Sequence, residues 1–133
     1  MGRKHMQIGE VAERTGLSLR TIRHYEEVGL APPTARSQGG FRLYTEDDVA
    51  RLLMIRRMKP LGFSLEEMRD LLSVLDALDS PDPPADRRAE LDRRLAEYRA
   101  RVDRRCAELR DLLADAEQFA AELSARLHDR QPH

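Results

Sequence analysis

Short segments of helical periodicity, separated by glycine and proline, fill the first half of the chain. Residues 7–15 place their apolar side chains on one face, and Gly16 can take the left-handed conformation that ends a helix. A second helix is expected over residues 18–28, with Ser18 as its N-cap. Because small Ala12 lets the two helices approach closely, this spacing predicts a helix-turn-helix.

The second helix of this pair carries polar side chains opposite its apolar anchors. Ile22 and Tyr25 lie at i and i+3 and are expected in the core, which turns the remaining side chains outward. Such a face can enter a major groove, where arginine donates two hydrogen bonds to guanine and threonine contacts the thymine methyl. The alternative is a helical hairpin with a solvated basic face. The outward residues are Arg20, Thr21, Arg23 and His24.

Residues 34–44 read as two short extended pieces around the Gly39-Gly40 turn, which predicts a β-hairpin. Alternation is expected to pack Phe41 and Leu43 on the head and to turn their neighbours outward. Outward basic and hydroxyl side chains suit phosphate contacts, so this hairpin would be a wing beside the helix-turn-helix. The residues expected outward are Arg36, Arg42 and Tyr44.

Capping signals predict two more helices in the head. Thr45 and Asp48 resemble a capping box for a helix to about residue 58, and Ser64 with Glu67 form a fuller one for the next helix. Basic residues between the two helices, including Lys59, precede a helix N-terminus that can receive a phosphate, which makes this loop a candidate second wing. The expected core faces are Val49, Leu52, Leu53 and Met58, then Leu65, Met68, Leu72 and Leu75.

The second half of the chain has a different pattern. From about residue 85 to 127 there is no glycine or proline, and apolar residues follow a heptad repeat. So long a helix cannot bury its own apolar stripe, which predicts a homodimer; a solvated charged helix is the alternative. The seam residues are Leu91, Leu95, Tyr98, Val102, Leu109, Leu112, Ala116, Phe119 and Leu123.

Cys106 lies one place after this seam, near the middle of the long helix. A structural role in packing is the expected one. If two helices paired antiparallel about their midpoints, two Cys106 side chains would approach each other, and an oxidation switch is the alternative role.

Three prolines at positions 81, 83 and 84 mark the boundary between the two halves. The expected organisation is mainly α, with a winged helix-turn-helix head followed by a long dimerisation helix. Residues 1–5 read as an expression remnant before a native start at Met6. The other expected parts are the head at 6–79, a Pro-rich linker at 80–84, the dimerisation helix at 85–128 and a tail at 129–133.

Overall charge does not indicate DNA binding, because 23 Lys+Arg against 24 Asp+Glu leave a net charge of −1 on 133 residues. By segment, residues 1–75 carry a net +2 and residues 76–133 a net −3. No apolar run approaches the roughly 18 residues of a membrane-spanning helix, and no secretion signal precedes the first helix. With one cysteine, a reduced, cytoplasmic protein without membrane contact is expected.

No cofactor or metal is expected. The four histidines are scattered and the single cysteine cannot complete a ligand set. Enzyme activity is the weakest interpretation, because no paired carboxylates, nucleophile with base, or phosphate loop occurs at workable spacing.

Four motifs, taken together, resemble the MerR family of bacterial transcription regulators. They read IGEVAERTGL, TIRHYEEVGL, GFRLYT and LGFSLEE, starting at Ile8, Thr21, Gly40 and Leu61. The resemblance covers about residues 6–78 and implies antiparallel pairing of the long helices into a coiled coil. It also implies binding to inverted repeats in promoters with long spacers, and distortion of that DNA so that RNA polymerase can use it.

On this resemblance the outward residues of the second helix face the major groove. Tyr25 would lie near the phosphates, with a core role as the alternative, and His24 would contact DNA or be solvated. The whole set expected at the DNA is Ser18, Arg20, Thr21, Arg23, His24, Tyr25, Arg36, Arg42, Tyr44 and Lys59.

The chain departs from the family pattern in several places. Pro60 interrupts a stretch that the family continues as helix, and Arg57 stands where thiol- or aldehyde-responsive members carry a cysteine. The start of the long helix and the tail lack the cysteines of metal-sensing members. Nothing after Leu127 is long enough for an effector domain, so a drug-binding regulator is not expected. The competing hypothesis is a coiled-coil adaptor or architectural protein with weak DNA binding.

Overall fold

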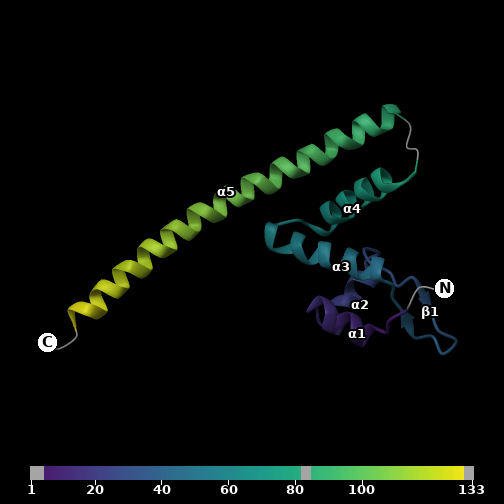
Figure 1. The fold of residues 1–133 in the computed structure, drawn as a ribbon, viewed down its shortest axis with the longest axis horizontal. Helices are drawn as coiled ribbons and strands as arrows, with labels where there is room; N and C mark the ends of the chain where they lie inside the picture. The colour runs from purple at the N-terminus through teal and green to yellow at the C-terminus, as the bar shows by residue number, and fades with distance from the viewer. Residues whose placement is uncertain (1–4, 82–84, 131–133) are drawn as a thin grey trace. The chain divides into compact units, whose positions relative to one another are not determined.

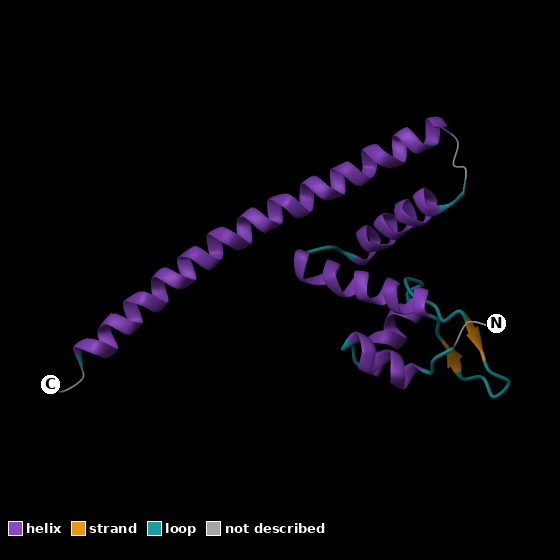
Figure 2. Ribbon diagram, viewed as in Figure 1, coloured by secondary structure: helices purple, strands orange, loops and turns teal. Residues whose placement is uncertain are grey.

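The computed structural model describes residues 5–81 and 85–130. Residues 1–4 of the expected remnant, 82–84 of the expected linker and 131–133 of the expected tail lie outside the described residues. The order of elements is α1 (Ile8–Thr15), α2 (Leu19–Glu27), β1 (Ala35–Arg36), β2 (Arg42–Leu43), α3 (Glu46–Met58), the 3-10 turn η1 (Lys59–Leu61), α4 (Leu65–Asp79) and α5 (Ala85–Asp129), as Figure 1 and Figure 2 show.

The described residues up to Ser73 form one compact unit, and those from Val74 onward form a second. The first unit contains α1, α2, α3, the hairpin and most of α4, and the second contains α5. The domain boundary expected at residue 79 stays a prediction.

α1 and α2 form the predicted helix-turn-helix because local signals set their ends. Gly16 ends α1 in the left-handed conformation, with φ of 74°. Ser18 caps α2, its Oγ accepting a hydrogen bond from the backbone N–H of Thr21 at 3.0 Å. Val11 of α1 and Ile22 of α2 are fully buried, which anchors both helices in the core of the head.

Two arginines from later helices hold the C-terminal ends of α1 and α2. Arg56 of α3 donates from Nη1 to the carbonyl oxygen of Thr15 at 2.8 Å, and Arg69 of α4 donates to that of Val28. Carbonyl groups at a helix C-terminus lack intrahelical partners and carry partial negative charge, so a guanidinium there is stabilising. Part of the positive charge of the head therefore serves its internal structure.

Both predicted capping boxes are confirmed. Thr45 Oγ1 accepts from the N–H of Asp48 at 3.3 Å, and Asp48 accepts from the N–H of Thr45 at 2.9 Å. Ser64 and Glu67 make the same exchange at 3.1 and 2.9 Å. The expected end of α3 is confirmed as well, because the chain tightens into η1 at Pro60.

α3 and α4 supply much of the core of the head. Leu52 and Ile55 of α3 are fully buried. Met68 and Leu72 of α4 are each only 2% exposed. Leu65 was expected in this core and is instead 38% exposed, because it is the first residue of α4 and lies at the open end of the helix.

The hairpin faces differ from the predicted ones. Tyr44 was expected to point outward, yet its side chain is fully buried, while Phe41, expected to pack inward, is 64% exposed. The reason is pairing beyond the hairpin, since Tyr44 and Met6 exchange two backbone hydrogen bonds of 2.8 Å in an antiparallel bridge. This pairing holds Tyr44 at the core, and Phe41 lies in the turn before β2.

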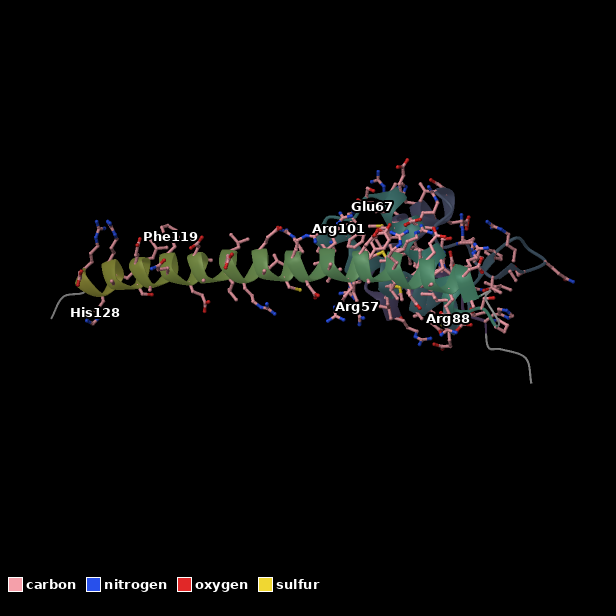
Figure 3. All side chains as sticks on the ribbon, turned by 90° about the horizontal axis from the view of Figure 1, so that it is seen from above. Arg57, Glu67, Arg88, Arg101, Phe119 and His128 are labelled. Carbon is pink, nitrogen blue, oxygen red and sulfur yellow. The ribbon has the colours of Figure 1, made fainter. Side chains whose placement is uncertain are left out.

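α5 is a continuous helix of 45 residues within the second unit, as predicted. Leu91 near its start is 4% exposed, whereas Leu112, Phe119 and Leu127 are 62%, 59% and 67% exposed. Figure 3 shows Phe119 projecting from the distal part of this helix. In the described part of α5, the distal apolar side chains are therefore largely exposed.

Among the helices described, none is both long and apolar enough to cross a membrane.

Candidate nucleic-acid interface

The outward face of α2 matches the prediction. Ile22 and Tyr25 are buried, at 0% and 4% exposure, whereas Arg20, Arg23 and His24 are exposed. The two anchors fix the rotation of the helix about its axis, so the three polar side chains are presented together. An exposed polar face of this kind is typical of a helix that enters a DNA groove.

Ser18 and Thr21 are linked at the start of this helix. Besides capping the helix, Ser18 donates from Oγ to Thr21 Oγ1 at 2.9 Å. The pair holds the threonine side chain in one orientation, half-buried at the edge of the outward face.

A recess of about 880 Å³ lies between α2 and the segment from η1 to α4. Buried Tyr25, Phe63 and Met68 contribute its apolar part. Its charged part holds three cations and one carboxylate, which gives it positive potential. We call it the α2 recess, and its lining residues are Arg20, Thr21, Arg23, His24, Tyr25, Glu27, Lys59, Phe63, Leu65 and Met68.

Six of the ten residues expected at the DNA line the α2 recess. Lys59 reaches it from η1, although more than thirty positions separate it from α2 in the sequence. Sequence reasoning missed Phe63 and Met68 as lining residues, because the helical spacing of Met68 indicated only that it faces inward and Phe63 lies in the loop before α4.

Tyr25 takes the core role that the sequence left as an alternative. Burial raises the pKa of its hydroxyl above the ordinary value of 10.0, so the side chain is neutral. The ring of His24 lies beside it, with centroids 5.9 Å apart and planes tilted by 44°. The buried ring of Tyr25 therefore lies next to the exposed imidazole of His24.

The wing places two arginines opposite each other. In the antiparallel register of β1 and β2, Arg36 pairs with Arg42 and Ala35 with Leu43. Like charges directly opposite across a sheet are destabilising. The structure resolves this repulsion with Glu26 of α2, whose carboxylate accepts from Arg36 Nη2 at 2.9 Å and from Arg42 Nε at 2.7 Å.

The electrostatics of Glu26 reflect these partners. The hydrogen bond from Arg42, followed by the positive charges of Arg42 and Arg36, holds the pKa of its carboxyl below the ordinary 4.5, although partial burial opposes the shift. Only 15% of its side chain is exposed. One feature of the sequence could have indicated Glu26. A carboxylate in the last turn of a helix lies near the negative end of the helix dipole, where a nearby cation stabilises it.

Tyr44 lies beneath this cluster. Burial, and then the charge of Glu26, raise the pKa of its hydroxyl above 10.0. Among the described residues, its hydroxyl oxygen has no hydrogen-bond partner.

Metal-binding side chains do not gather in the described part of the chain, where no group of three or more His, Cys, Asp or Glu residues is placed to hold an ion.

Two family models match the chain and overlap on α3 and α4. The model described as MerR HTH family regulatory protein matches residues 6–75, and the one described as MerR, DNA binding matches residues 49–126. The chain belongs to the MerR family.

Relatives of this MerR chain include several named regulators. It is 36% identical over 126 residues to the HTH-type transcriptional regulator CueR of Salmonella typhi, with 90% of this chain and 86% of CueR covered. It is 46% identical over 70 residues to the mercuric resistance operon regulatory protein of Bacillus cereus, covering 53% of each chain. The MerR chain thus matches only about half the length of that second relative.

The fold of the chain is similar to that of HiNmlR, a MerR family regulator lacking the sensor domain, whose crystal structure was solved bound to promoter DNA. The TM-score is 0.68 at 24% identity, with 92% of each chain covered.

Replacing Glu26 with glutamine is expected to lower the free energy of unfolding of the head by about 1 kcal/mol near neutral pH, because two guanidinium groups lose a charged acceptor. A carboxyl with a lowered folded-state pKa stabilises fully above its ordinary value of 4.5 and stops doing so as the pH falls through the folded-state value. The melting-temperature difference between wild type and Glu26→Gln should therefore be constant near neutrality and shrink below about pH 4.5.

Glu13→Gln, at an exposed position on α1, supplies the baseline for removing a carboxylate. A melting-temperature difference for Glu26→Gln that stays the same from pH 7 to pH 3 would contradict the ion-pair account.

Proposed function

We propose that this MerR-family chain is a transcription regulator that binds an inverted repeat in promoter DNA as a homodimer and distorts that DNA for RNA polymerase. The observation that carries the proposal is the convergence of the exposed α2 face, Lys59 and the arginines of the wing on one compact unit. Such a regulator acts in the bacterial cytoplasm, where promoter DNA and RNA polymerase are found.

In this proposal α2 enters the major groove and two other elements bind phosphates. Arg20 and Arg23 read base edges, while Lys59 and Arg42 supply sequence-independent contacts. Tyr25 and Tyr44 are buried, so the proposal leaves out the direct phosphate contacts that were expected of them. The proposed DNA-facing residues are Ser18, Arg20, Thr21, Arg23, His24, Arg36, Arg42 and Lys59.

The homodimer rests on the uncovered stripe of α5. Several large apolar side chains in its distal part are between 38% and 67% exposed, and a second copy of the helix is the simplest closed cover. The pairing is antiparallel, as is typical of the family, and places the two heads to bind the halves of an inverted repeat. Half-buried Cys106 is assigned to packing in this pairing rather than to an oxidation switch.

Selection of bound DNA from a random or genomic pool tests the proposed function directly. An inverted repeat within promoter sequences is expected to be enriched by the full chain, because each head of the dimer reads one half-site. Failure to enrich any sequence would contradict the proposal and favour the adaptor hypothesis.

Substitutions in α2 and in the wing should have different effects on binding. Arg23→Ala is expected to weaken binding to the selected operator by about 1 to 3 kcal/mol and random DNA much less. Arg42→Ala should weaken binding to both and lower the salt slope by about one unit, because a phosphate contact is lost. Titrations by fluorescence anisotropy at several salt concentrations measure both quantities.

The control for charge removal is Arg93→Ala, in which an exposed arginine of α5 is replaced. Equal affinity of all three variants for the operator would rule out the assigned docking mode.

Phe119→Asp tests the dimer interface. A carboxylate in the paired stripe loses aromatic burial worth about 3 kcal/mol or more and forces a charge into an apolar contact, so the dimer should dissociate to monomers. Sedimentation equilibrium measures the change, and Ala121→Asp makes a similar substitution on the opposite face of the same helix. Dimers of equal stability in both variants would exclude this stripe as the interface.

A further inference from the structure

We infer that Glu26 is a positioning residue for DNA binding, whose carboxylate holds the guanidinium of Arg42 so that its terminal nitrogens meet a DNA phosphate. This inference rests on the proposed function and adds to it an acidic residue that would ordinarily be counted against binding. The carboxylate joins α2, which carries it, to the two arginines of the wing.

The bonding pattern of Arg42 leaves the right donors available. Its Nε donates to Glu26 Oε2 at 2.7 Å, and among the described residues neither terminal nitrogen has a protein acceptor. An arginine held through Nε presents both terminal nitrogens as a fork, which matches two phosphate oxygens. About a quarter of the side chain, 26%, is exposed, so the fork is held at the surface.

Arg36 is engaged differently. Its Nη1 donates to the carbonyl oxygen of Gly40 at 3.2 Å and its Nη2 to Glu26 Oε1 at 2.9 Å. Each terminal nitrogen therefore already has one protein acceptor, in the turn of the wing for Nη1 and on α2 for Nη2. This division of roles leaves Arg42 as the better phosphate donor of the cross-strand pair.

Glu26 also fixes the wing to the recognition helix. It lies on the same short helix as Arg23, and its two partners are 10 and 16 residues further along the chain. Without the carboxylate, two opposed arginines would repel each other and the fork would lose its anchor. Ordering the wing before DNA arrives reduces the conformational cost of binding.

The alternative is that Glu26 competes with DNA for the two arginines. The two accounts predict opposite changes in DNA affinity when the carboxylate is removed. A competitor, or a carboxylate acting only through its charge, weakens binding to a polyanion, so its removal should tighten the complex. A positioning residue strengthens binding despite its charge, so its removal should loosen the complex.

The experiment compares wild type and Glu26→Gln, both as full chains, on the selected operator and on random DNA at fixed salt. We expect Glu26→Gln to bind both about threefold to tenfold more weakly, even though the protein has lost a negative charge. Glu13→Gln, which removes a carboxylate from α1 away from the cluster, is expected to bind as wild type or slightly tighter.

Two further variants separate positioning from folding and from charge. In an Arg42→Ala background, Glu26→Gln should cause little additional loss, because the positioned group is already gone. Arg42→Lys keeps the positive charge but lacks Nε and the fork, and is expected to lose nearly as much affinity as Arg42→Ala. This last variant leaves Glu26 with its Arg36 partner and provides the test should Glu26→Gln fail to fold.

The outcomes are distinct. Operator binding by Glu26→Gln that is equal to or tighter than wild type overturns the inference while the proposed function stands. Arg42→Lys with wild-type affinity also overturns it. A wild-type chain that enriches no operator removes the proposed function and the inference together.

Discussion

Two arginines facing each other across a two-stranded hairpin repel each other, and a negative charge between them relieves that repulsion. In this protein that charge comes from Glu26, on the helix that also carries the exposed polar face, so the repulsion within the wing becomes a link between two elements. The link also satisfies a carboxylate placed at the unfavourable end of the α2 dipole. Two electrostatic costs are thus relieved by one pair of salt bridges, and the geometry of the wing depends on them.

Features that local sequence controls were predictable from the sequence. Helix ends followed from Ser18, Thr45 and Pro60, because a capping oxygen or a missing N–H acts on its immediate neighbours. The outward face of α2 followed from the spacing of its apolar anchors. Placements that depend on remote pairing did not follow from the sequence. Tyr44 is the clearest case, since its partner Met6 lies 38 positions earlier in the chain. Glu26 was missed for the same reason, because neither arginine partner is its neighbour in the chain.

The net charge of −1 concealed how the positive charges are divided. Arg56 and Arg69 bind carbonyl oxygens at the ends of α1 and α2, and Arg36 donates to Gly40 of the wing and to Glu26 of α2. Arg20 and Arg23 remain exposed, and with Lys59 they border the α2 recess. A count of basic residues therefore overstates the charge offered to a polyanion, and the hydrogen-bond partner of each guanidinium is the better guide.

The exposure of apolar side chains in the distal half of α5, against 4% at Leu91 near its start, makes pairing of the chains depend on their concentration in the cell. A single chain displays a row of leucines that invites aggregation and proteolysis, whereas a paired chain conceals it. At low abundance the concentration of pairs rises as the square of the concentration of chains. Occupancy of the proposed two-part operator would then respond more steeply to synthesis than occupancy by a monomeric regulator.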